Sequence, residues 1–180
     1  KQAFASCSAL TTAILPERLT TIGDLAFSVC SKLANLVIPS TVTVIGAEAF
    51  RTCNALKVVN LPAGLETLTE NAGTLTDDKD ARIRVFDYCA GLEEFSIAET
   101  NKNYKVIDGI LYKQVYDKDD AEKLLGYELV VCPAAKPGVI DLPKETIAIS
   151  NHAFYNNKQV QEIKFSQGLD GAMSIGVYAF

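Results

Sequence analysis

Hydrophobic positions repeat along this chain at intervals of 23 residues. The stretch LPERLTTIGDLAF (Leu15–Phe27) matches IPSTVTVIGAEAF (Ile38–Phe50) at its proline, its isoleucine-glycine pair and its alanine-phenylalanine pair. A third phenylalanine, Phe4, lies one further step of 23 residues upstream. Self-similarity at a fixed period in this range is typical of a solenoid, in which each repeat forms one coil.

The same spacing indicates six repeats. Phe86 and Phe154 restart the pattern, and Leu142-Pro143 marks a unit that has no phenylalanine at its head. The units therefore start near residues 4, 27, 50, 86, 131 and 154, and insertions near 70–84 and 101–130 account for the two longest spacings. We expect a single solenoid domain over residues 1–180. Because both ends of the chain already lie in repeat phase, we also expect a fragment of a longer array.

Each unit predicts a short strand followed by turns. The residues 9 and 11 positions after the phenylalanine are apolar, and the residue between them varies in type from unit to unit. This alternation favours a strand with one face inward. The proline that follows ends this strand because it cannot donate a backbone hydrogen bond. Gly23, Gly46 and Gly176 suit a turn that needs positive φ. The alanine-phenylalanine pair and the next cysteine predict a helical or 3₁₀ turn on the opposite side of the coil.

These repeated positions resemble the BspA-like branch of the leucine-rich repeats, whose units read LxxLxIPxxVxxIGxxAFxxC. The resemblance implies an α/β repeat solenoid, a right-handed coil with a parallel β-sheet on its concave face and short helical or 3₁₀ turns on its convex side. The stretch NKNYKVIDGILYKQV (101–115) is similar to an insert of this family, in which Asp-Gly forms a two-residue turn between strands. We therefore expect a β-hairpin insertion, with Gly126–Pro133 as its return strand. The chain departs from the family pattern at Ser150, where glycine is usual, and at Asn157, where cysteine is usual.

Composition narrows the classes of partner. The chain is 48% hydrophobic but has no apolar run near 18 residues, so we expect a folded core and no membrane span. Its formal net charge of −5 argues against nucleic acid as a partner, because phosphate backbones attract basic proteins.

Four of the five cysteines share one repeat position, which favours a structural role. Cys7, Cys30, Cys53 and Cys89 each lie three residues after the phenylalanine position, and we expect them to stack as a ladder of small apolar side chains on the convex side. Cys132 lies outside this ladder, and we expect it to pack under the hairpin. The chain has no Cys-x-x-Cys pair for zinc or redox chemistry.

The sequence offers no catalytic constellation, so we expect neither an enzyme nor a cofactor. The single histidine, His152, precedes Ala153-Phe154, and we expect it to be partly exposed on the convex side. Acidic residues crowd both insertions, but neither run has the spacing of an EF-hand or its closing glutamate. Solvated loops are the favoured interpretation, no metal site is assigned, and calcium binding by these loops stays an open question. The residues concerned are Asp77, Asp78, Asp80, Asp117, Asp119, Asp120 and Glu122.

Binding remains, and the strand positions predict where it occurs. Residues 8 and 10 positions after the phenylalanine point outward from the concave sheet: Thr12, Ile14, Asn35, Val37, Val58, Asn60, Glu94, Ser96, Asp141, Glu162 and Lys164. In this hypothesis, Ile14, Val37 and Val58 form an apolar patch that contacts a protein ligand. In the alternative, they are ordinary β-branched residues of a strand and have no binding role. A second candidate surface is the set of tyrosines in and around the hairpin: Tyr104, Tyr112, Tyr116 and Tyr127.

Two functions stay open at this point. The family resemblance implies an extracellular or cell-surface bacterial protein that adheres to a protein ligand, such as a host extracellular-matrix protein. The alternative is a structural spacer that holds another domain away from the cell surface. Oligomeric state is not predicted by either.

Overall fold

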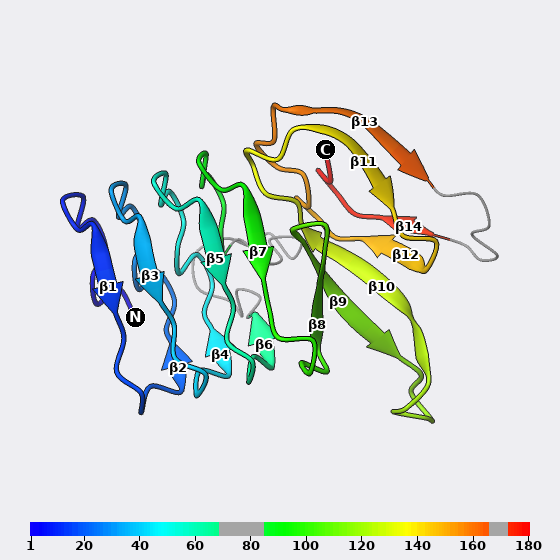
Figure 1. Ribbon diagram of the computed structural model, residues 1–180, viewed down its shortest axis with the longest axis horizontal. Helices are drawn as coiled ribbons and strands as arrows, with labels where there is room; N and C mark the ends of the chain where they lie inside the picture. The colour runs from blue at the N-terminus through cyan, green and yellow to red at the C-terminus, as the bar shows by residue number, and fades with distance from the viewer. Residues whose placement is uncertain (69–84, 166–172) are drawn as a thin grey trace.

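The computed structural model describes residues 1–68, 85–165 and 173–180 and shows strands joined by turns (Figure 1). The first set of strands contains the outward positions of each repeat, and in β1, β5 and β7 a buried residue lies between two exposed ones. Its members are β1 (Thr12–Ile14), β3 (Asn35–Val37), β5 (Val58–Asn60), β7 (Glu94–Ser96), β11 (Gly138–Leu142) and β13 (Val160–Phe165). They pair in parallel as β1 with β3, β5 with β7 and β11 with β13. Corresponding repeat positions lie in register, for example Ile14 beside Val37.

A second set of strands forms the other wall of the coil. Its members are β2 (Thr21–Ile22), β4 (Val44–Ile45), β6 (Thr67–Leu68), β12 (Thr146–Ile149) and β14 (Ser174–Ile175). β2, β4 and β6 form one parallel sheet, and β12 pairs in parallel with β14. The chain is thus a β-solenoid of about six turns with parallel strands, and the expected solenoid architecture is confirmed.

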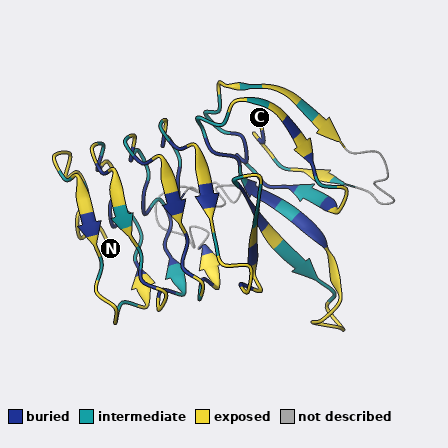
Figure 2. Cartoon of the chain, in the orientation of Figure 1, coloured by how far each residue is buried: buried dark blue, intermediate teal, exposed yellow. Residues whose placement is uncertain are grey.

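The core consists of side chains stacked one coil upon the next. Phe4, Phe27, Phe50 and Phe86 form a continuous ladder of near-parallel rings, with centroids 5.0, 5.6 and 5.6 Å apart. Each such pair contributes about 0.5–1.5 kcal/mol beyond the area that it buries. Leucine, valine and isoleucine from the strands and from the turns between them fill the remaining interior, where most of them are fully buried (Figure 2).

The expectation of helical or 3₁₀ turns on the convex side is wrong for the described residues, where the phenylalanine lies between two tight turns. The amide of Ala26 donates to the Gly23 carbonyl, and the amide of Cys30 donates to the Phe27 carbonyl. The third residues of these turns, Leu25 and Val29, have φ of 55° and 62°, whereas a right-handed helix requires negative φ throughout.

Two other amides of these turns, those of Leu25 and Phe27, donate to the neighbouring coil. Leu25 N donates to Ala47 O at 2.9 Å, and Phe27 N donates to Ala49 O at 2.8 Å. A helix would have directed these donors along its own axis. These backbone amides therefore join adjacent coils and are not available for the hydrogen bonds of a helix.

Gly46 and Gly176 are required for space and not for positive φ, so the expectation of positive φ at the repeat glycines was also wrong. Gly23, Gly46 and Gly176 have no positive φ. A Cβ atom on Gly46 would lie 2.7 Å from the carbonyl carbon of Gly23, and one on Gly176 would lie 2.7 Å from that of Ser150. Adjacent coils approach so closely at this position that a side chain collides with backbone.

The hairpin insertion is part of the solenoid wall. β8 (Tyr104–Ile107), β9 (Ile110–Tyr116) and β10 (Leu124–Val131) pair antiparallel, and β10 also pairs in parallel with β12. The resulting sheet has the order β14-β12-β10-β9-β8. Asp108 and Gly109 form the two-residue turn expected from the sequence, with φ of 49° and 71°.

The ring ladder is interrupted at the unit that lacks a phenylalanine. Cys132 N donates to Ala153 O at 2.7 Å, as Phe27 N does to Ala49 O, so Cys132 takes the place of the phenylalanine. The ladder resumes with Phe154 stacked on Phe180. The sequence placed the start of this unit near Val131, one residue away.

The close approach of adjacent coils predicts that Gly46→Ala lowers the free energy of unfolding by about 1–3 kcal/mol, the usual cost of overpacking. Gly23→Ala is the matched control, because the added Cβ would come no closer than 3.0 Å to the backbone nitrogen of Lys1, the first residue of the chain. Urea unfolding of both variants measures the difference. Equal free energies of unfolding for the two variants would contradict the prediction, because they would show that adjacent coils move apart at Gly46 with little loss of stability.

Candidate functional site

All eleven predicted surface residues lie on exposed positions of the first set of strands. The short strands β1, β5 and β7 show the pattern exposed, buried, exposed, because successive side chains of a strand point to opposite faces. Their middle residues, Ala13, Val59 and Phe95, enter the core. We name the outward side of β1, β3, β5, β7, β11 and β13 the strand face; Figure 2 shows its exposed residues in yellow.

The first three strands of this face carry no charged outward residue. Ile14 is 76% exposed, Val37 53% and Val58 41%. Ile14 lies in register with Val37 on the adjacent strand. The side-chain amide of Asn35 donates to the Thr12 hydroxyl. This part of the strand face is therefore a small apolar surface with neutral polar side chains beside it.

The hairpin turn divides the strand face, a feature that the sequence analysis missed. The Phe95 amide of β7 donates to the Gly109 carbonyl at 2.9 Å, so the Asp108-Gly109 turn occupies the edge of β7. A Cβ atom on Gly109 would lie 2.9 Å from Cβ of Glu94. Strands β1, β3, β5 and β7 consequently form one part of the face, and β11 and β13 form the other.

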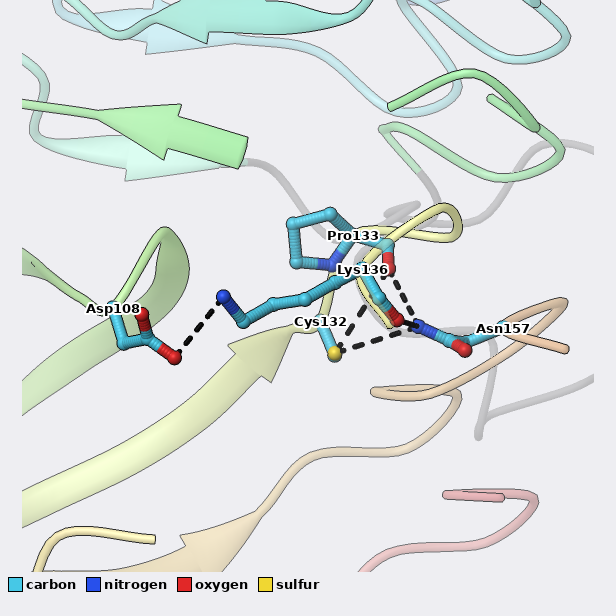
Figure 3. A network of polar contacts seen from close by, with 5 residues as sticks. All are labelled: Asp108, Cys132, Pro133, Lys136 and Asn157. Atoms are coloured by element: carbon cyan, nitrogen blue, oxygen red, sulfur yellow. Dashed lines mark hydrogen bonds and ion pairs between the residues drawn. The ribbon is translucent and has the colours of Figure 1, made fainter. Parts of the chain in front are cut away.

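Figure 3 shows the polar contacts that fix this turn. Lys136 Nζ lies 3.0 Å from Asp108 Oδ2, and the lysine side chain is only 15% exposed. Asn157 Nδ2 donates to the carbonyls of Pro133, at 2.7 Å, and Lys136, at 3.1 Å. Asn157 stands at a cysteine position of the repeat, and its two amide donors hold the loop from which Lys136 reaches the turn.

The hairpin tyrosines do not form the contact surface that the sequence suggested. Tyr104 and Tyr112 are buried, Tyr127 is 9% exposed, and Tyr116 is half-buried. Tyr104 Oη accepts a hydrogen bond from the Leu68 amide at 3.0 Å, which joins the hairpin to β6. These rings pack inward because the hairpin is a wall of the solenoid and not an appendage.

The cysteine ladder is present, and its thiols also donate hydrogen bonds. The Sγ atoms of Cys30, Cys53 and Cys89 lie 3.1, 3.2 and 3.0 Å from the carbonyl oxygens of Phe4, Phe27 and Phe50. Burial raises the pKa of Cys53 to about 12 and raises the pKa of Cys30 and Cys89 as well. Cys7, in the first coil, is exposed.

Cys132 packs beneath the hairpin, in a buried cluster with Ile110 and Tyr112. Burial raises the pKa of this thiol to about 12. Thiolates are the reactive form of cysteine, so none of the four buried cysteines is a ready nucleophile.

His152 is buried, against the expectation of partial exposure. Its ring stacks on Tyr178, with centroids 5.5 Å apart, and meets the edge of Tyr155. Its backbone amide donates to Val177 O, so the histidine lies between the last two coils.

The acidic residues of the second insertion stabilise their own turn. Asp117 accepts a hydrogen bond from the Asp119 amide and pairs with Lys123 Nζ at 3.0 Å. The bond from the Asp119 amide lowers the pKa of Asp117. Asp120 accepts a hydrogen bond from the Glu122 amide. Asp77, Asp78 and Asp80 lie outside the described residues, and within those residues no group of three potential metal ligands is found.

The repeat geometry defines a leucine-rich-repeat solenoid, and comparison with known proteins gives its family. The sequence model described as "BspA type Leucine rich repeat region" matches this chain in six copies, over residues 1–105 and 137–180. The chain belongs to this family. No match is found among curated proteins.

Solved structures of bacterial proteins share the fold. A leucine-rich cell surface protein of Faecalibacterium prausnitzii A2-165 is 26% identical, with a TM-score of 0.72 over 99% of this chain and 41% of its own. The pneumococcal vaccine antigen PcpA is 24% identical, with a TM-score of 0.64 over 93% of this chain and 39% of its own. A leucine-rich repeat protein of Eubacterium ventriosum is 21% identical, with a TM-score of 0.66 over 100% of this chain and 47% of its own.

This chain spans less than half the length of each of these three proteins. Within the described ranges, no helix is long and apolar enough to cross a membrane. Leucine-rich repeats generally bind proteins, and the family includes bacterial surface proteins. A role in protein interaction or adhesion is therefore the broad function that the fold suggests.

The hydrogen bond between hairpin and solenoid predicts that Tyr104→Phe lowers the free energy of unfolding by about 1–3 kcal/mol, because the buried Leu68 amide loses its acceptor. Tyr116→Phe is the matched control. Its half-buried hydroxyl lies 3.4 Å from Gln114 Oε1, and its removal should change stability by less than about 0.5 kcal/mol. Denaturant unfolding compares the two. A larger loss for Tyr116→Phe would contradict the prediction.

Burial of the thiols predicts that Ellman's reagent at pH 8 titrates one of the five cysteines rapidly in the folded protein, namely Cys7. Cys7→Ser should abolish the fast phase, and denaturant should expose the other four. Two or more fast thiols would contradict the burial of the ladder.

The same pKa shifts predict a pH dependence of stability. Below the unfolded thiol pKa of about 8.5, both the folded and the unfolded state keep these thiols protonated. Above that pH only the unfolded chain loses its protons, because the folded pKa values are higher. Stability should therefore fall as the pH rises from about 8.5 towards 12, which unfolding curves at fixed ionic strength measure.

Proposed function

We propose that this chain is a non-enzymatic protein-binding module of a secreted or cell-surface bacterial protein, and that it contacts its ligand through the strand face. The observation that carries the proposal is the exposure of Ile14, Val37 and Val58 on three successive coils. Burying such side chains in an interface is favourable, at about 25 cal/mol for each Å² of apolar area.

The rigidity of the coils supports a role in recognition. Backbone hydrogen bonds between coils hold the outward side chains of β1 and β3 in fixed register. A preorganised surface loses little conformational entropy when it binds. The extended sheet of a solenoid is the surface that such proteins commonly use.

The chemistry of the strand face favours a protein over a glycan. None of the eleven predicted residues is aromatic, and sugar rings usually stack on tyrosine or tryptophan. A host extracellular-matrix protein is the class of ligand that the family resemblance suggests. The cell-surface protein of Faecalibacterium prausnitzii, which shares the fold, supports the proposed surface location.

The proposal predicts that a Val37→Asp variant loses at least about tenfold in affinity for a protein ligand, because an aspartate in the contact would be buried without a partner. Binding of the purified chain to fibronectin, fibrinogen and other matrix and serum proteins is measured by biolayer interferometry. Circular dichroism checks that the variant stays folded.

Val29→Asp is the matched control, since Val29 is 39% exposed but lies in a convex turn with φ of 62°, which aspartate tolerates. Loss of binding in Val37→Asp alone supports the strand face. Equal binding by both variants would move the site elsewhere. Failure to bind any protein of the panel would favour a structural spacer.

A further inference from the structure

Two exposed valines of the strand face each lie beside a glutamate on the next strand. Val58 of β5 is in register with Glu94 of β7, and Val139 of β11 is in register with Glu162 of β13. The valines are 41% and 47% exposed, and both glutamates are exposed. Strands in register lie about 4.8 Å apart, so each valine and its glutamate form one contiguous surface.

These carboxylates differ from the other charges near them. Lys136 is paired with Asp108, Lys57 with Glu93, and Asp141 lies in register with Lys164. Within the part of the chain that the structure describes, the side-chain carboxylates of Glu94 and Glu162 make no hydrogen bond or ion pair. The strand face therefore presents two negative charges without a counter-charge in the described residues.

A partner that covers Val58 also takes water away from Glu94. Removing water from an ionised carboxylate is costly unless a positive charge replaces the lost hydration. Burying the valine under a purely apolar partner would therefore favour binding, but the lost hydration of the glutamate would cost more free energy than this burial supplies. Lysine and arginine satisfy both neighbours, because their aliphatic stems cover apolar surface while their charged heads reach a carboxylate.

We propose that the strand face recognises a basic protein segment, in which lysine or arginine side chains lie over Val58 and Val139 and pair with Glu94 and Glu162. Apolar residues of the same ligand contact Ile14 and Val37. The formal net charge of −5 favours the approach of such a ligand. This inference rests on the proposed function, because it names the chemistry of the ligand for the same surface.

The probe is a short synthetic peptide in which arginine alternates with valine, together with a matched peptide in which glutamate replaces arginine. Binding is followed by NMR through the methyl resonances of Val58 and Val139 in the intact chain. We expect saturable shifts with the arginine peptide, none with the glutamate peptide, and weaker binding at higher salt.

The protein variants separate a specific contact from general charge attraction. Glu94→Gln with Glu162→Gln should weaken binding of the arginine peptide by about tenfold or more, since two charge-assisted contacts are lost. Glu17→Gln with Glu99→Gln is the control, because it makes the same change in net charge at exposed glutamates away from the strand face. Its affinity should equal that of the parent chain.

The inference is overturned if both double variants bind the arginine peptide equally, if the glutamate peptide binds as well, or if neither peptide shifts the valine methyls. In each case the Val37→Asp measurement with the protein panel decides separately whether the strand face binds protein at all. One further outcome separates the two proposals. If a ligand no longer binds the Val37→Asp variant but still binds the Glu94→Gln, Glu162→Gln variant, the strand face binds protein, as the proposed function states, but the ligand is not a basic segment.

Discussion

The close, regular spacing between adjacent coils is the constraint on which the rest of this structure depends. Parallel strands pair at about 4.8 Å, and every part of the coil has to keep that distance. Where Gly46 lies against the backbone of Gly23, no side chain fits between coils. In the turns around Phe27, the Leu25 and Phe27 amides donate across the same gap, and Leu25 and Val29 adopt positive φ where a helix was expected.

The same constraint explains the cysteines. A cysteine is small enough for the ladder, and its thiol reaches the phenylalanine carbonyl of the preceding coil, as Cys53 does with Phe27. Asn157 fills the corresponding place in the last full unit with stronger donors, and it uses them to hold the loop that carries Lys136. The position at which Asn157 replaces the usual cysteine is therefore also the position that helps to fix the hairpin turn beside the strand face.

The hairpin changes the solenoid more than an ordinary surface loop would. Its strands enter the second wall, its buried Tyr104 joins it to β6, and its turn occupies the edge of β7. The Tyr88 and Tyr155 hydroxyls meet at 2.8 Å across the unit in which Cys132 replaces the phenylalanine. The hairpin turn thereby separates β1, β3, β5 and β7 of the strand face from β11 and β13.

The sequence alone determined the repeat, its period, the alternation in strands such as β1 and β5, and the Asp108-Gly109 turn, because these depend on spacing within a single coil. It could not determine contacts between coils. The convex turns, the true reason for Gly46, the burial of Tyr104, Tyr112 and His152, and the division of the strand face were decided by the tertiary structure. Each arises where one coil meets another or where the hairpin enters the wall, and a pattern read along the chain contains no distance between such segments.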